Sequence, residues 1–258
     1  MTDITGPLFK WFGTKWNASR RYPKPRHEWI FEPYAGSAGY SLRHHTKRVV
    51  VYEANQHLAS LWCWLINEAR SQDILQIPIG LPVGANIQAL DLSEGQKLLL
   101  KSWQRTNNVG NCWTTSPWGN LPGQWTTNTR RRVAREIAGI KHWQFREPTF
   151  EEVGTYFMDP PYQYNYNYKL PVSDYSALAQ RVRSIPQGSQ ILCCEAICQK
   201  TGKVPDYLPF VFFRSQVTSR RKSSQNHHSK ELLYYVDGAP KPDPQGSGSE
   251  DLTGPSAR

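Results

Sequence analysis

The feature that most constrains the fold of this chain is an alternation of short apolar strands with helices near its N-terminus. The run 28–33 (EWIFEP) predicts a buried strand, and the small residues of 34–45 lie where a strand turns into a helix. A second apolar run, 47–53 (KRVVVYE), precedes 54–69, in which apolar residues recur at helical spacing. Strand–helix–strand–helix order implies a parallel sheet, so we expect an α/β fold.

The same alternation resumes in the second half of the chain. We expect strands over 141–146, 155–159, 189–195, 207–217 and 231–236, and an amphipathic helix over 173–185. The separation of the last two strands suits a final antiparallel pair. In such sheets ligands bind beyond the carboxyl ends of the strands, and three expected strands end at an acid: Glu32, Glu53 and Asp159.

The segment 71–139 breaks this alternation. It contains a stretch rich in Pro and Gly (77–87), a short helical stretch (93–105), a long run with Asn, Gly and Trp that is typical of a hairpin or an exposed loop (106–129), and a helix with its arginines off the apolar face (129–140). We therefore expect a main domain formed by 1–70 and 140–238, an inserted domain over 71–139, and a disordered tail over 239–258.

The composition indicates a polyanionic partner in a reducing compartment. The net charge is +10 and the pI about 9.4, which suits nucleic acid, an acidic membrane surface or simply a basic soluble protein. With 10 Trp and 13 Tyr, stacking on unpaired bases is a further possibility. The five cysteines form no C-x-x-C pair, and no apolar run is long enough for a bilayer. We expect a cytoplasmic protein with no metal site and no membrane partner.

The loop after the first strand and the acid that ends the second strand favour nucleoside binding. Small residues after a strand let the backbone approach a ligand closely. Glu53 can accept hydrogen bonds from ribose hydroxyls, and it lies 53 − 36 = 17 residues after Gly36, close to the usual separation of about 20. The alternative is that Glu53 only caps the helix that begins near Asn55.

The stretch 158–162 (MDPPY) predicts a rigid pair of hydrogen-bond acceptors. Each proline fixes its own φ, biases the preceding residue towards extended geometry and lacks an N–H. The acceptors that remain are the Asp159 carboxylate and the Pro160 carbonyl, which match the two donors of an NH2 group. Tyr162 adds a flat face for a heterocycle. The alternative is an ordinary turn at a strand end.

Four stretches in this order resemble the motifs of Dam-type DNA N6-adenine methyltransferases: 9–16 (FKWFGTKW), 30–39 (IFEPYAGSAG), 51–55 (VYEAN) and 158–162. The resemblance covers roughly 8–237. It implies a Rossmann-like methyltransferase sheet, mostly parallel with a final antiparallel strand pair, and a small inserted target-recognition domain. It also implies S-adenosylmethionine as cofactor, double-stranded DNA as partner, and a monomer or weak dimer.

The resemblance also assigns site residues. Those implied for the cofactor are Trp11, Lys15, Glu32, Pro33, Tyr34, Ala35, Gly36, Ser37, Glu53, Asn55, Phe150 and Asp159. Those implied for the target base are Asp159, Pro160 and Tyr162. Within the first set, Lys15 is expected to reach the cofactor's carboxylate and Phe150 to line the adenine pocket. The chain departs from the family pattern at Thr14, at 34–38, at Glu53, where Asp is usual, and at Thr149, where an acid is common.

The insert is expected to contact DNA. The candidate residues are Lys101, Arg105, Asn107, Asn108, Trp113, Trp118, Arg130, Arg131, Arg132 and Arg135. For the arginines, a solvated helix face is the alternative. The basic run 220–222 is a weaker candidate.

The predicted activity is transfer of a methyl group from S-adenosylmethionine to N6 of an adenine flipped out of DNA. Hydrogen bonds to Asp159 and Pro160 would offset the positive charge that develops on the amine. No cysteine follows a proline, which argues against methylation of cytosine C5 through a thiolate. The alternatives are N4 of cytosine in DNA, an adenine in RNA, and an inactive DNA-binding relative.

Overall fold

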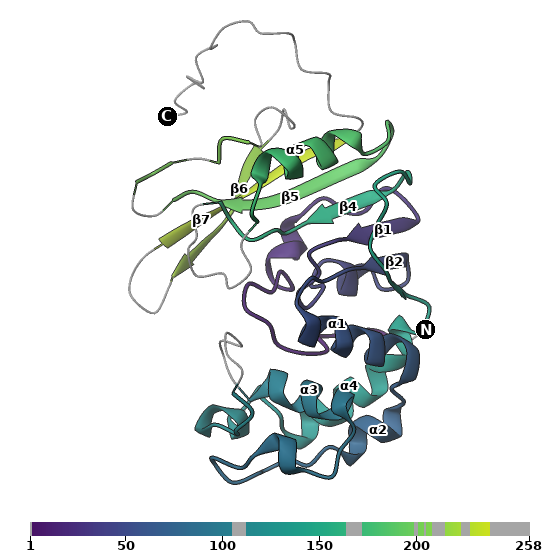
Figure 1. Cartoon of the computed structure of the whole chain (residues 1–258), viewed down its shortest axis with the longest axis vertical. Coiled ribbons are helices and arrows are strands. Elements are labelled where there is room, and N and C mark those ends of the chain that lie inside the picture. The colour runs from purple at the N-terminus through teal and green to yellow at the C-terminus, as the bar shows by residue number, and fades with distance from the viewer. Residues whose placement is uncertain are drawn as a thin grey trace, which may run out of the picture.

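The computed structural model describes residues 2–104, 112–163, 172–198, 201–203, 205–207, 215–222 and 228–237. Its centre is a seven-stranded sheet in the order β3-β2-β1-β4-β5-β7-β6 (Figure 1). The strands are β1 (Trp29–Glu32), β2 (Arg48–Val51), β3 (Gln144–Phe145), β4 (Thr155–Met158), β5 (Gln190–Ala196), β6 (Ser215–Lys222) and β7 (His228–Asp237).

Five neighbouring strands, β3, β2, β1, β4 and β5, run parallel to one another. With the helices between them they confirm the predicted α/β class. Beyond β5 the sheet continues with β7 and β6, which run antiparallel to their neighbours. Of the strand expected over 207–217, residues 208–214 lie outside the described residues, and β6 covers 215–217 and continues to Lys222. Pairing with β7 sets the register of β6, from Ser215 opposite Tyr234 to Lys222 opposite His228.

Helices cover both faces of the sheet, as parallel sheets require (Figure 1). On one face, α5 (Tyr175–Ser184) buries Leu178 and Val182 in a cluster with Phe31 and Tyr156. The opposite face packs against α1 (Gln56–Cys63), which continues into a π-helical turn at Trp64–Glu68. Asn55 begins α1, because its side chain accepts hydrogen bonds from the amides of residues 57 and 58.

The segment 71–139 lies below the sheet in Figure 1 and packs on α1. Its helices are α2 (Ser71–Gln76), α3 (Glu94–Trp103) and α4 (Thr127–Glu136). Short turns of helix cover Ala18–Arg21, Ser41–His44, Ile87–Ala89, Pro117–Asn120 and Ile137–Ile140. The apolar side chains of α3 and α4 belong to the same buried cluster as those of α1. The separate inserted domain therefore stays a prediction.

Of the hairpin or exposed loop expected over 106–129, residues 106–111 lie outside the described residues. One isolated bridge joins Asn86 to Thr114, so the described part of this stretch pairs with the preceding Pro- and Gly-rich loop. Trp125 donates its indole N–H to the Pro78 carbonyl at 3.0 Å and fixes the same two loops together. Within the described ranges, no helix combines the length and the apolar character needed to span a membrane. The expected tail, 239–258, lies outside the described residues.

Candidate functional site

The carboxyl ends of β1, β2 and β4 open onto a cavity of about 410 Å³. The cavity lies where the strand order reverses, because β2 follows β1 on one side and β4 flanks β1 on the other. This is the switch point at which parallel sheets bind ligands. Ten residues assigned from the sequence line it: Trp11, Lys15, Glu32, Tyr34, Ala35, Gly36, Ser37, Glu53, Asn55 and Asp159.

The loop after β1 is shaped for a close approach of backbone to ligand. Gly36 has a φ of +49°, and a Cβ there would meet the Trp11 indole at 3.0 Å. The Gly36 carbonyl accepts the Trp62 indole N–H at 2.9 Å, which fixes the loop on α1. The Ser37 hydroxyl lines the cavity and is buried without a hydrogen-bond partner in the described part of the chain. An unsatisfied buried hydroxyl at a cavity wall is a group available to a ligand.

Glu53 connects this loop to the start of α1. One carboxylate oxygen accepts the Gly36 N–H at 3.0 Å and the other accepts the Asn55 N–H at 2.9 Å. Both sequence readings of Glu53 thus have support, because it holds the helix start and also lines the cavity. Burial raises its pKa. A carboxylate oxygen has two lone pairs, so each can accept a further bond from a ligand hydroxyl.

Glu32 is a buried acid at the end of β1. Its carboxylate accepts hydrogen bonds from the Ser41 amide, at 3.1 Å, and from the Ser41 hydroxyl. Burial raises the pKa of Glu32 to about 8, more than these hydrogen bonds lower it, which makes the neutral form accessible near neutral pH. A neutral carboxyl can donate as well as accept a hydrogen bond.

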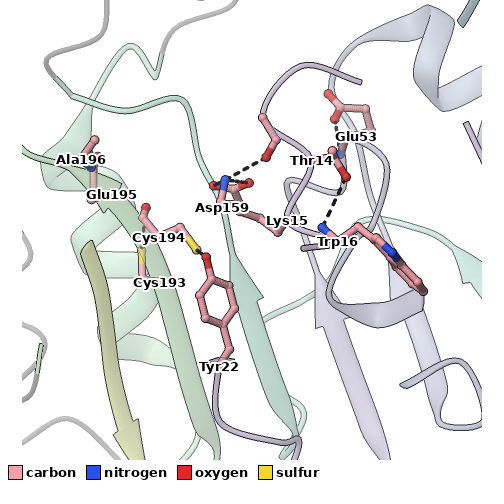
Figure 2. Close-up of polar contacts among 12 residues, drawn as sticks. Thr14, Lys15, Trp16, Tyr22, Glu53, Asp159, Cys193, Cys194, Glu195 and Ala196 are labelled. Atoms are coloured by element: carbon pink, nitrogen blue, oxygen red, sulfur yellow. Dashed lines mark hydrogen bonds and ion pairs between the residues drawn. The ribbon is translucent and has the colours of Figure 1, made fainter. Parts of the chain in front are cut away.

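Lys15 and Asp159 form an ion pair on the cavity wall (Figure 2). The Lys15 Nζ donates to both Asp159 oxygens, at 2.7 and 2.6 Å, and to the Gly13 carbonyl at 3.1 Å. The same ammonium lies 5.3 Å from the centre of the Tyr162 ring. The sequence assigned Lys15 to the carboxylate of a cofactor. The structure places it on Asp159, and the cofactor contact stays a prediction.

Four assigned residues are not part of the cavity wall. Pro33, Pro160 and Tyr162 lie next to wall residues in the chain, whereas Phe150 lies elsewhere. The Phe150 ring is buried against Tyr156, with 5.8 Å between ring centres, in the cluster beneath α5. The structure thus does not bring Phe150 to the cavity, because its ring is packed into this apolar cluster instead.

The sequence missed the α5 side of the cavity and a fourth acid. Ser173, Asp174, Ala177, Leu178 and Arg181 line the cavity from the start of α5, and their helical spacing was read only as amphipathic. Glu195 is fully buried near the end of β5, and it accepts the Gln163 N–H at 3.0 Å. The signal was present, because 189–195 ends in an acid as the other three strands do.

The predicted DNA contacts of α4 divide into two pairs. Arg132 forms an ion pair with the fully buried Glu136 at 2.6 Å and donates to the Pro7 carbonyl at 2.7 Å. Arg130 donates to the Ile77 carbonyl at 3.0 Å. Arg131 and Arg135 are exposed. Only the second pair therefore projects from the surface with its guanidinium groups accessible.

The remaining predicted contacts are partly described. The Lys101 ammonium lies 4.1 Å from the centre of the half-buried Trp113 ring, a cation–π contact. Trp118 has 57% of its surface exposed. Arg105, Asn107 and Asn108 lie outside the described residues, as do the side chains of 220–222.

Comparisons with known proteins add nothing to the interpretation of this site. No protein-family model matches the chain, and a search of curated proteins finds no match either. The functional conclusion therefore rests on the geometry of the cavity and on the chemistry of the groups that line it.

Proposed function

We propose that this protein transfers a methyl group from S-adenosylmethionine to N6 of an adenine flipped out of double-stranded DNA. The observation that carries the proposal is the cavity itself. It joins a glycine loop and a half-buried acid, Gly36 and Glu53, to the acceptor Asp159 at one switch point. A nucleoside-binding half and an amine-binding half thus face one another in a single space.

The cavity wall fits the cofactor. A Cβ at Gly36 would press against the Trp11 indole, Ser37 has an unsatisfied hydroxyl, and Glu53 has lone pairs to spare for ribose hydroxyls. S-adenosylmethionine supplies an electrophilic methyl group when bound. Glu32, held by Ser41 at the floor of the loop, offers a polar group to the amino-acid end of the same molecule.

The acceptor pair at the end of β4 holds the target amine. The Asp159 carboxylate and the Pro160 carbonyl accept its two N–H groups, which favours a tetrahedral nitrogen and offsets the positive charge that develops on it. Lys15 fixes the orientation of the Asp159 carboxylate through two short contacts. Asp159 therefore acts by orientation and electrostatics rather than as a strong base.

DNA binding in this proposal uses the insert and the surface of α4. Arg131 and Arg135 are the exposed cations that can reach phosphate, and Trp118 is an exposed aromatic on the same segment. Extruding the base costs a few kcal/mol, and stacking on Tyr162 recovers about 1–3 kcal/mol. We assign the role of target recognition to 71–139.

The test measures cofactor binding and product identity together. Calorimetry with S-adenosylmethionine is expected to show one site per chain, and methyl-labelled cofactor is expected to give labelled N6-methyladenine in unmethylated duplex DNA. Absence of cofactor binding would overturn the proposal. Label found in N4-methylcytosine, or in RNA offered in parallel, would reassign the substrate, and binding without transfer would leave a DNA-binding relative.

A further inference from the structure

The segment that follows Asp159 is held by a buried carboxylate outside the cavity wall. We propose that Glu195 is a positioning residue, which keeps the Asp159–Pro160 acceptors and Tyr162 in place by anchoring the amide of Gln163. This inference rests on the proposed methyl transfer and goes beyond it, because Glu195 contacts neither the cofactor nor the base in that mechanism.

The proline pair explains why an anchor is needed at this position. Pro160 and Pro161 have no N–H, so two successive residues cannot tie the segment to the sheet through their amides. The Gln163 N–H donates to Glu195 Oε1 at 3.0 Å, immediately after Tyr162. Glu195 lies near the end of β5, the strand next to β4, so it reaches this amide from a rigid element.

Among the described residues, the groups hydrogen-bonded to the Glu195 carboxylate are all donors. Oε1 also accepts the Tyr207 hydroxyl at 3.1 Å, and Oε2 accepts the Ala196 N–H at 3.0 Å. Glu195 itself is fully buried. Figure 2 shows it on the strand beside the one that carries Asp159. Three donors match a carboxylate, because two of them are backbone amides that can only donate and a protonated carboxyl could turn its O–H only towards the Tyr207 hydroxyl.

Two further contacts fix the chain on either side of Tyr162. The Tyr175 hydroxyl of α5 donates to the Pro161 carbonyl at 2.8 Å. The Gln163 side chain donates to Asp206 at 2.5 Å and accepts the Asp206 N–H at 3.2 Å. The Tyr175 and Tyr207 rings touch, with 4.9 Å between centres, so the contact at Pro161 and the contacts of the Gln163 side chain belong to one network around Glu195.

The charge state of this network changes near neutral pH. Burial raises the pKa of Glu195 to about 7, and the nearby Asp159 adds to the rise, while the hydrogen bonds from Ala196, Gln163 and Tyr207 oppose it. The other titratable groups around it are Cys193 on the same strand, Tyr175 on α5 and Asp206 beyond Gln163. Because the pKa is raised, protonation as the pH falls through about 7 replaces the charge-assisted hydrogen bond from the Gln163 amide with a weaker neutral one, which loosens the anchor.

The test compares Glu195→Gln with Glu195→Ala in the full-length protein. Glutamine reproduces the neutral carboxyl, with one oxygen acceptor for Gln163, and removes the titration, so we expect its turnover to stay between pH 8 and 6 near the lower level that the wild type reaches at pH 6. Alanine removes the anchor, and turnover is expected to fall about 10- to 100-fold because small misplacements of reacting groups are costly. The affinity for S-adenosylmethionine should stay within about twofold in both variants, as neither touches the cavity wall.

A second measurement reports the anchor without catalysis. Hydrogen–deuterium exchange of the Gln163 amide is expected to be at least tenfold faster in Glu195→Ala than in the wild type. Glu151→Gln, at an exposed glutamate before β4, is the matched control and should change nothing. Unchanged exchange, or the same acidic decline in Glu195→Gln as in the wild type, would overturn the assignment. A wild type that transfers no methyl group would instead refute the proposed function, and exchange would still decide on the anchor.

Discussion

The cavity edge of the sheet and the helix α4 each contain a buried glutamate, but the two carboxyl groups differ in the partners that bond to them. Glu32, at the cavity, takes its hydrogen bonds from Ser41 and has its pKa raised to about 8 by burial. Glu136, at the end of α4, is equally buried and accepts from Arg132 at 2.6 Å and from the Thr5 amide and hydroxyl at 3.1 and 2.6 Å. The paired acid holds elements together, whereas the acid that faces the cavity keeps capacity for a ligand.

The basic residues also differ in their partners, because some pair with acids and others are exposed. Lys15 holds an acid on the cavity wall, and Arg132 holds Glu136 inside the scaffold. Arg131 and Arg135 of α4 point outwards instead. The basic residues of α4 thus include one that pairs inside the fold and two that are exposed on its outer surface. Variants can separate the two roles, because cavity groups should affect ligands and buried pairs should affect stability.

The largest effect is expected at Asp159. Replacing it with alanine removes one of the two proposed acceptors, and loss of such a group lowers turnover by about 10²–10³-fold. Binding of duplex DNA should persist because α4 is untouched. Methyl transfer measured with labelled cofactor checks the first expectation and a binding titration checks the second. Asp3→Ala, at an exposed acid near the N-terminus, is the matched control and should retain full turnover.

The next largest effect is expected at Glu136, on stability rather than activity. Glu136→Ala leaves the partly buried Arg132 without its carboxylate, and breaking a buried pair costs about 3 kcal/mol. Arg135→Ala breaks only a 3.5 Å contact of a side chain that is 63% exposed, so its cost should stay below about 1 kcal/mol. Urea unfolding of both variants measures the two losses in the free energy of unfolding. Equal losses would mean that Glu136 is not the residue that fixes α4 to the N-terminal segment.

A smaller effect is expected from Glu53→Gln, on cofactor affinity. The amide nitrogen of glutamine cannot accept, so the variant loses one of the two backbone contacts together with any ribose contact at the same atom, and the affinity should fall about tenfold. Stability should change little, since removing a buried charge offsets the lost bond. Calorimetry measures the affinity, with Glu68→Gln, an exposed acid near α1, as control. Unchanged affinity would restrict Glu53 to holding the start of α1.

The cavity could be predicted from short motifs because topology brings strand ends together. Glu32, Glu53 and Asp159 are far apart in the chain, yet the carboxyl ends of parallel strands meet at one edge. The same rule covers Glu195, whose strand was interpreted for burial alone. The Lys15–Asp159 pair could not be predicted in this way. It spans 144 residues and depends on the path of an irregular N-terminal segment, for which no periodic pattern exists.

In the insert, periodicity predicted elements but not partners. The spacing of apolar residues located α3 and α4 to within a few residues. It placed the arginines off the apolar face, yet it could not tell that Arg130 and Arg132 reach carbonyls of remote segments at Ile77 and Pro7. Long side chains on the flank of a helix can bond neighbours or solvent, and only the packed structure separates these outcomes.

The smallest effect is expected from the outward arginines of α4, and it concerns salt dependence. Each phosphate contact contributes about 0.9 to the slope of log affinity against log salt, so Arg131→Ala with Arg135→Ala should reduce the slope for duplex DNA by about 2. The matched control removes the same charge elsewhere, through Arg26→Ala with Arg48→Ala. Both residues are exposed near the amino ends of strands, at the end of the sheet away from the cavity. An equal reduction in both double variants would assign α4 to a solvated surface, and only a selective reduction supports it as the surface that meets DNA.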